Sequence, residues 1–348
     1  MQLEWGWPAA SDDVMTITTI EAHAAGEPLR IVNAGLPELP GDTILARRRY
    51  MRENLDHVRR ALMWEPRGHY DMYGCILTPP VSDEADLGVL FLHNEGYSTM
   101  CGHGVIALVT ALFETGTLPA SGRETPVNLD TPAGLVRATA HLDERGHVER
   151  VSFLNVPSFL FARDVEIDVP GFGRVLTDVA FGGAFYAVLP AERLGLEVRP
   201  EQSAALIDAG EVVKRAVNQA LTLRHPDDPD LDFLYGTILT GPPGDSVHHS
   251  RNICVFANAE VDRSPTGTGV SARLAIHHAR GEIGEGESIA IESILGAQSV
   301  FSGRVIDTTR VEDIPAVIPE VSGTGFITGR AEYRIDPRDS LGQGFLLR

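Results

Sequence analysis

The chain has 348 residues, of which 43% are hydrophobic, and its 29 Lys and Arg against 48 Asp and Glu give a formal net charge of −19 at pH 7. This length predicts about two domains, with enough apolar residues for a core in each. The charge argues against nucleic acid or an anionic membrane as a partner, because both repel an acidic surface.

The cysteines and the first residues bear on the compartment. Cys75, Cys101 and Cys254 are too few, and odd in number, for a disulfide framework. Residues 1–14 lack the basic and apolar regions of a signal peptide, and no stretch has the roughly 18 apolar residues of a membrane helix. We therefore expect no secretory leader and a soluble protein in a reducing, cytoplasmic setting.

Short strands dominate the pattern along the chain, because β-branched and aromatic residues recur between Gly and Pro. The predicted strands are residues 14–21, 72–77, 88–93, 127–131, 135–141, 148–155, 177–181, 185–188, 250–256, 288–292 and 298–305. Apolar residues at helical spacing predict helices over residues 42–64, 104–114, 201–223 and 269–280. The arginine run of the first helix is expected to form a solvated face rather than a nucleic-acid site.

This order of elements occurs twice. A strand, a Gly-rich turn, an apolar helix and a further strand follow one another around Cys101 and again around Thr266. The repeat is domain-sized, which predicts two related halves rather than a solenoid. We place the first half at residues 14–178 with 324–348 and the second at 179–323. Two such halves often enclose a site between them.

The segment MCGHG at residues 100–104 places Cys101 at the start of a predicted helix. The N–H groups and the helix dipole there favour a thiolate and would lower the thiol pKa. Gly102 and Gly104 let a ligand approach the backbone closely. A buried core thiol is the commonest fate of a cysteine, but a core residue does not need glycines one and three positions later. The segment therefore favours a base beside an anion site.

The segment DRSPTGTG at residues 262–269 predicts a second turn that leads into a helix. The N–H groups of Gly267 and Thr268 can bind a carboxylate there. Thr266 occupies the position that Cys101 has in the first half. A side chain of this turn can also simply cap the helix, which does not exclude a site.

These two segments resemble the signature motifs of the proline racemase family. The likeness extends to AGEPLR at residues 25–30, FGGAFYA at 181–187 and GTGF at 323–326, and it spans roughly residues 14–348. The resemblance implies an α/β fold like that of diaminopimelate epimerase. It has two pseudo-symmetric halves, each with strands wrapped around a central helix, and an active site in the cleft between them. It also implies that no metal or pyridoxal cofactor takes part.

Thr266 departs from the racemase pattern of this family. Racemases and epimerases of the family use two cysteines, one on each side of the α-carbon of a proline-type substrate. A threonine hydroxyl is too weak an acid and base to replace the second thiol. We interpret Cys75 and Cys254, which lie in strand patterns, as core thiols. Two-base inversion is therefore disfavoured.

A single base still permits an elimination. The Cys101 thiolate would remove the α-proton of a 3-hydroxyproline, and the carbanion would expel the 3-hydroxyl as water. The Cys101 and Thr266 pattern is similar to that of the trans-3-hydroxy-L-proline dehydratase branch of the family. Its product would be an enamine that tautomerises to Δ1-pyrroline-2-carboxylate.

The resemblance also implies roles for the remaining residues of the two turns. We expect the substrate carboxylate against the N–H groups around Gly102, Gly104, Gly267 and Thr268, and the ring nitrogen against His103 and Asp262. Thr266 is expected to hydrogen-bond the leaving hydroxyl or a nearby water. Cys101 and His103 alone are weak evidence for a metal.

Two other functions stay open from the sequence. One is a proline racemase or hydroxyproline 2-epimerase in which water or another group takes the part of Thr266. The other is a protein that binds a proline analogue without catalysis. The expected partner in every case is a small imino acid, and a homodimer is the default assembly.

Overall fold

A computed structural model describes residues 3, 6, 8, 13–226 and 229–347. Most of residues 1–14, where we expected no leader, lies outside this described part. Within it, no helix combines the length and the apolar character needed to cross a membrane.

The first half of the fold is a mixed sheet around one helix. Its strands are β1 (Met15–Ala24), β2 (Glu27–Ala34), β3 (Tyr73–Thr78), β4 (Leu87–His93), β5 (Tyr97–Ser98), β6 (Glu124–Thr131), β7 (Gly134–Leu142) and β8 (Val148–Leu154). The β1–β2 and β3–β4 pairs are antiparallel, whereas β2–β3 is parallel. β4 pairs antiparallel with β5 and parallel with β6, and α3 (Gly102–Glu114) follows β5.

The second half repeats this pairing. Its strands are β10 (Gly173–Phe181), β11 (Phe185–Pro190), β12 (Leu234–Gly241), β13 (Ser250–Phe256), β14 (Glu260–Asp262), β15 (Ser288–Ser293) and β16 (Gly296–Val311). β10–β11 is antiparallel, β11–β12 parallel and β12–β13 antiparallel. β13 pairs antiparallel with β14 and parallel with β15, and α5 (Gly267–Ala279) follows β14. The internal repeat predicted from the sequence is therefore confirmed.

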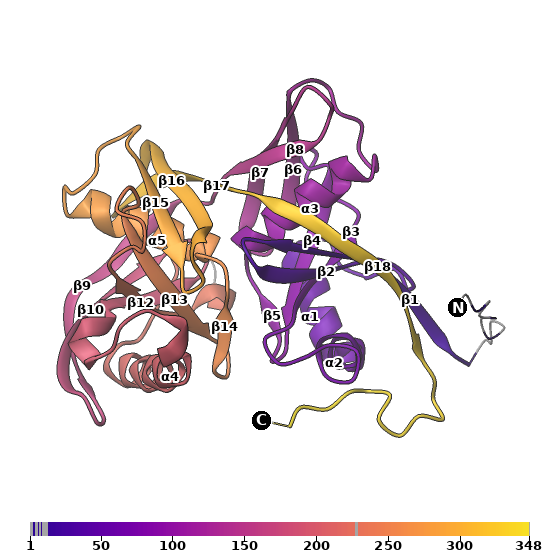
Figure 1. Cartoon of the computed structure of the whole chain (residues 1–348), viewed down its shortest axis with the longest axis horizontal. Helices are drawn as coiled ribbons and strands as arrows, with labels where there is room; N and C mark the ends of the chain where they lie inside the picture. Colours follow the sequence, from indigo (N-terminus) through magenta and orange to yellow (C-terminus); the bar gives the residue numbers. More distant parts are fainter. Residues whose placement is uncertain (1–2, 4–5, 7, 9–12, 227–228, 348) are drawn as a thin grey trace.

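Two long strands, β17 (Ile314–Gly323) and β18 (Gly325–Ile335), tie the halves together, and β9 (Ser158–Val169) pairs with β10 and β17. β17 pairs with β16 of the second half and β8 of the first, and β18 returns to pair with β1. Figure 1 shows the halves side by side, with β17 and β18 running from one to the other. The residue boundaries that we assigned to the halves remain a prediction.

Three further helices lie outside the sheets' centres: α1 (Ile44–Asn54), α2 (Asp56–Met63) and α4 (Ser203–Ala220). Short 3-10 turns occupy Ala191–Leu194, Pro200–Gln202 and Pro229–Leu231. The single helix predicted over residues 42–64 is wrong, because Leu55 leaves helical geometry (φ −126°, ψ 18°) and separates α1 from α2. The solvated arginine face is also wrong for Arg59, which is buried and donates to the carbonyl oxygens of His93 and Asn94.

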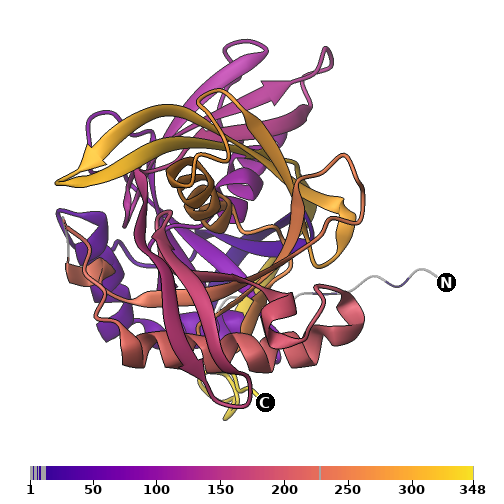
Figure 2. The ribbon, with the colours of Figure 1, turned by 90° about the vertical axis from the view of Figure 1, so that its left-hand side faces the viewer.

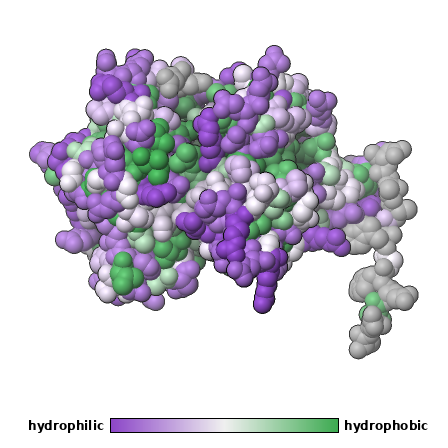
Figure 3. All heavy atoms as spheres, turned by 90° about the horizontal axis from the view of Figure 1, so that it is seen from above, coloured by the Kyte–Doolittle hydropathy of each residue, from purple (hydrophilic) through white to green (hydrophobic). Residues whose placement is uncertain are grey.

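Each central helix is enclosed by the strands of its own half. Every residue of α3 except Glu114 is buried, as are the first ten residues of α5. Figure 2 shows α5 ringed by strands. The strands leave one end of each helix, its N-terminus, facing the other half. The face shown in Figure 3 is largely hydrophilic, with apolar residues in separate areas, as the acidic composition leads one to expect.

Candidate active site

The N-termini of α3 and α5 meet where the two halves adjoin. A Cβ added to Gly102 would lie 2.5 Å from the Cα of Gly267, and one added to Gly267 would lie 2.7 Å from the Cα of Gly102. Only glycine permits this approach. The first N–H groups of a helix have no intrahelical partner and carry a partial positive charge. The contact therefore brings two sets of such donors to one place.

A small cavity lies at this contact. Its volume is about 20 Å³, and its lining is Tyr73, Met100, Cys101, Gly102, His103, Tyr186, Tyr235, Cys254, Phe256, Asp262, Thr266, Gly267 and Thr268. The space admits about one water molecule. All predicted site residues except Gly104 line it. Larger hollows, of about 440 and 280 Å³, lie elsewhere and contain no residue of the two motifs.

Cys101 caps α3 with its sulfur. The Sγ atom accepts a hydrogen bond from the N–H of Gly104 at 3.2 Å. Gly104 therefore contacts the Cys101 sulfur rather than the cavity. Burial and the charge of Asp262 raise the pKa of the Cys101 thiol well above its ordinary value, although the Gly104 N–H lowers it. The predicted lowering of this pKa is therefore wrong for the closed cavity, because exclusion of water outweighs the helix start.

His103 lies against the Cys101 sulfur, with Nδ1 3.2 Å from Sγ. The same nitrogen is 4.0 Å from a carboxylate oxygen of Asp262, which connects the residue to the second half. Burial lowers the pKa of His103 to about 4 despite the opposing effect of Asp262. The imidazole is therefore neutral near pH 7, and it can donate one hydrogen bond and accept one.

Thr266 precedes α5 in a different conformation from that of Cys101. Its φ is 64° and its ψ 95°, which is unusual for a β-branched residue, whereas Cys101 is extended. The Thr266 side chain does not cap the helix. Within the described part of the chain, its buried Oγ1 atom has no hydrogen-bond partner. This hydroxyl is therefore available to a group inside the cavity.

Cys254 contributes a second thiol to the same cavity, which the sequence did not indicate. It lies on β13 directly opposite Asp262 on β14 and is fully buried. Burial and the Asp262 charge raise the pKa of this thiol well above its ordinary value, with Thr266 close enough to lower it. Cys254 is a buried thiol, as we interpreted it from the sequence. It also lines the cavity beside Thr266, which that interpretation did not include.

Three tyrosines complete the polar lining. The hydroxyls of Tyr73 and Ser98 share a hydrogen bond, and Tyr235 lies 3.3 Å from Tyr73 in the same group. The hydroxyl of Tyr186 is 2.7 Å from Oγ1 of Thr268. Tyr186 belongs to the FGGAFYA segment, so the sequence pointed to its neighbourhood. The other two lie on separate strands without any motif.

A contact between the fully buried Glu27 and Arg263 fixes the turn that carries Thr266. The Glu27 carboxyl group accepts hydrogen bonds from the backbone N–H of Arg263 at 2.7 Å and from its guanidinium at 2.8 and 3.1 Å. Burial raises the pKa of Glu27 to about 8, against the lowering effect of Arg263. Glu27 comes from the AGEPLR segment of the first half, so this pair joins two motifs across the halves.

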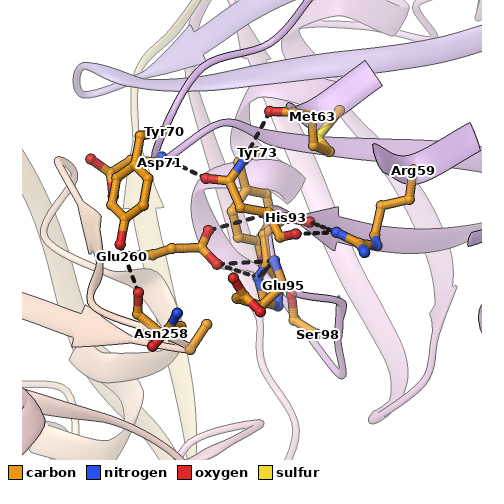
Figure 4. A network of polar contacts seen from close by, with 12 residues as sticks. Arg59, Met63, Tyr70, Asp71, Tyr73, His93, Glu95, Ser98, Asn258 and Glu260 are labelled. Atoms are coloured by element: carbon orange, nitrogen blue, oxygen red, sulfur yellow. Dashed lines mark hydrogen bonds and ion pairs between the residues drawn. The ribbon is translucent and has the colours of Figure 1, made fainter. Parts of the chain in front are cut away.

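A second polar network crosses between the halves beside the cavity (Figure 4). Glu260 of β14 accepts from His93 at 2.9 Å and from the N–H groups of Asn94 and Glu95 at 3.2 Å. Both His93 and Glu260 are buried. The network holds the two halves in the arrangement that closes the cavity.

The described residues include no group of three or more His, Cys, Asp or Glu side chains placed to hold a metal ion. All three cysteines are free and buried. What the site offers chemically is a thiol beside a neutral imidazole, helix N–H donors for an anion, a carboxylate for a cation and an unpartnered hydroxyl on the facing helix.

The sequence profile of the family described as proline racemase matches residues 19–346 of this chain. The chain belongs to the proline racemase family. Relatives in this family agree closely along its whole length. A trans-3-hydroxy-L-proline dehydratase of Burkholderia ambifaria is 50% identical over 96% of this chain and 98% of its own. The Homo sapiens protein of the same name is 49% identical over 95% of each chain.

One relative in the proline racemase family carries another name. A 3-hydroxyproline 2-epimerase of Burkholderia multivorans is 49% identical over 96% of this chain and 98% of its own. Sequence identity to the relatives therefore does not distinguish dehydration from epimerisation. The residues of the site have to distinguish them.

Solved structures with the same architecture confirm the fold. A hydroxyproline epimerase from Agrobacterium vitis, with trans-4-hydroxy-L-proline bound, matches with a TM-score of 0.89 at 33% identity and covers 96% of both chains. A PhzF-family protein from Bacillus anthracis matches with a TM-score of 0.59 at 14% identity, covering 91% of this chain and 99% of its own. The predicted α/β fold with two pseudo-symmetric halves is therefore correct.

Proposed function

We propose that this protein dehydrates trans-3-hydroxy-L-proline to Δ1-pyrroline-2-carboxylate. The observation that carries the proposal is the asymmetry of the two helix starts. Cys101 at α3 has a sulfur with two hydrogen-bonding neighbours, whereas Thr266 at α5 has only a hydroxyl. One strong base supports removal of a proton and loss of a leaving group, but not inversion by two bases. The names of several relatives at about 50% identity agree with this activity.

The other site residues take the roles that the family resemblance implies. The free N–H groups of Gly102 and of Gly267 and Thr268 would receive the substrate carboxylate. Asp262 and His103 would hold the ring nitrogen. A protonated ring nitrogen beside the sulfur would also favour the Cys101 thiolate, which burial alone disfavours. Gly104 acts through Cys101, since its N–H is bound to the sulfur.

A second candidate is 3-hydroxyproline 2-epimerisation, and one observation favours it. Cys254 places another thiol in the cavity beside Thr266, so a second proton donor is present in principle. The relative from Burkholderia multivorans bears this name. Against it, Cys254 lies on a strand rather than at a helix start. Binding without catalysis is the weakest candidate. A protein that only binds its ligand has no use for a thiol held at a helix start, which Cys101 provides.

The test is incubation of the purified protein with trans-3-hydroxy-L-proline, without any added cofactor, followed by NMR. We expect the signals of Δ1-pyrroline-2-carboxylate to replace those of the substrate. Accumulation of cis-3-hydroxy-D-proline instead would establish the epimerase. An unchanged substrate that nevertheless binds, as seen by calorimetry, would leave only the binding protein.

A cytoplasmic location, a homodimer and independence of any cofactor are further parts of this proposal. The three free thiols support the first. The dimer rests on the general frequency of two-fold assemblies. Independence of a cofactor rests on the family resemblance, and activity of protein treated with a chelator would support it.

A further inference from the structure

The stereochemistry of the proposed substrate restricts where its leaving group can lie. C2 of a trans-3-hydroxy-L-proline ring carries a carboxylate on one face and the α-hydrogen on the other. The hydroxyl on C3 is trans to the carboxylate, so it projects from the same ring face as the α-hydrogen. A base that reaches the α-hydrogen therefore also faces the hydroxyl that must leave.

Because the α-hydrogen and the 3-hydroxyl share one face of the ring, both bonds that break lie on the same side of the cavity. If Cys101 removes the α-proton, as proposed above, the hydroxyl lies on the α3 side, next to the Cys101 sulfur and His103. Thr266 comes from the start of α5 and so faces the other side of the ring. The expectation that Thr266 bonds the leaving hydroxyl is therefore incompatible with Cys101 as the base.

An acid is still required, because hydroxide leaves poorly unless it receives a proton. On the α3 side there are two candidates, which touch each other at 3.2 Å: the Cys101 thiol, which has just taken up the α-proton, and His103. Burial lowers the pKa of His103 to about 4, so its imidazole holds no spare proton near pH 7. The thiol is the only one of the two that carries a transferable proton at that stage.

The α5 side of the cavity holds two groups that carry a proton. The Thr266 hydroxyl is a very weak acid. Cys254 lies beside it and is a protonated thiol, because burial raises its pKa well above the ordinary value. Both groups lie on the face of the ring opposite the leaving hydroxyl, so neither is placed to protonate it.

We propose that Cys101 acts twice on one face of the ring, first as the base at C2 and then as the acid at the C3 hydroxyl. The C2–H bond breaks and an S–H bond forms; the electron pair at C2 forms the C2–C3 double bond. The C3–O bond breaks, the S–H proton joins the oxygen, and water leaves. The thiolate is regenerated in the same turnover, so no second acid or base is needed. This syn elimination explains why a threonine suffices opposite Cys101.

The inference rests on the proposed function. Comparing the cis and trans isomers of 3-hydroxy-L-proline tests the inference separately from the function. The cis-3-hydroxy-L-proline isomer presents its α-hydrogen to Cys101 but its hydroxyl to Thr266. We expect it to compete with the trans isomer, because Thr266 can hydrogen-bond its hydroxyl. In deuterated water it should take up deuterium at C2 with retention of configuration. Its dehydration should be slower than that of the trans isomer by about 100-fold or more, the usual effect of losing a positioned acid.

The outcomes are distinguishable with the wild-type protein alone. Dehydration of the cis isomer within about 10-fold of the trans rate would overturn the inference, because an acid would then act on the Thr266 side. A cis isomer that neither competes nor exchanges would also count against it, since Cys101 would not reach that α-hydrogen. Failure of the trans isomer to react would remove the proposed function itself.

Discussion

At the scale of single residues, the account depends on the thiol of Cys101. In the closed cavity this thiol is neutral, because burial and Asp262 raise its pKa. Its two hydrogen-bonding neighbours, His103 and the Gly104 N–H, are placed to stabilise the thiolate once the substrate brings a positive charge. The residue is therefore inactive when the site is empty and becomes a base when the site is filled.

Replacing Cys101 tests this role directly. Cys101→Ser keeps the size and a hydroxyl but removes the acidic thiol, so kcat should fall by about 10²–10⁴-fold, measured by pyrroline formation. Cys75→Ala is the matched control, because Cys75 is equally buried on β3 but does not line the cavity. Turnover of the serine variant near the wild-type rate would remove Cys101 from the mechanism.

The same residue predicts the dependence on pH. A thiol with a raised pKa is protonated at pH 7, and the thiolate fraction grows as the pH rises toward that pKa. The value of kcat/KM for trans-3-hydroxy-L-proline should therefore increase between about pH 7 and 9, by up to about tenfold per pH unit. A flat profile over this range would mean that the free enzyme already holds a thiolate.

At the scale of elements, the site depends on the contact between the starts of α3 and α5. Gly102→Ala would place a methyl group 2.5 Å from the Cα of Gly267, where only backbone lies. The two helix starts would have to separate, and kcat/KM should fall by more than about 10-fold, since small misplacements of reacting groups are costly. Gly122→Ala is the control, because nothing lies within 4 Å of its added Cβ. Equal activity of the two variants would contradict the geometry.

Elements also show what the sequence could and could not predict. Cys101 and Thr266 were found because each stands in a Gly-rich turn before an apolar helix, which is a local pattern. β18 was missed because most of its residues are exposed and only its second half, residues 330–335, alternates between charged and apolar side chains. Cys254 and Tyr235 were missed as site residues, because only the tertiary pairing of their strands determines which side chains of a buried strand face the cavity.

At the scale of the whole molecule, the cavity of about 20 Å³ is too small for a five-membered ring, so the halves must separate to admit a substrate. The contacts that hold them include Glu260 with His93 and the adjacent N–H groups. These contacts must break when the halves separate, and water then takes the place of the lost partners.

Glu260→Gln tests the contribution of this network. The amide keeps the shape but loses the charge and one acceptor, so the free energy of unfolding should fall by about 1–3 kcal/mol. Glu144→Gln is the control, because the Glu144–Arg123 pair is highly exposed and should contribute less than about 1 kcal/mol. Denaturant unfolding measures both. No loss at Glu260 would show that the network does not stabilise the closed form.

The central claim is that one thiol acts on one face of the substrate. The most direct test is the configuration of the substrate that remains when trans-3-hydroxy-L-proline is half converted, determined by chiral chromatography. The account predicts Δ1-pyrroline-2-carboxylate as the product and unreacted substrate that is entirely the original L isomer. Recovery of cis-3-hydroxy-D-proline in the residual substrate would contradict it, because a second group, with Cys254 the first candidate, would then be delivering protons to the opposite face.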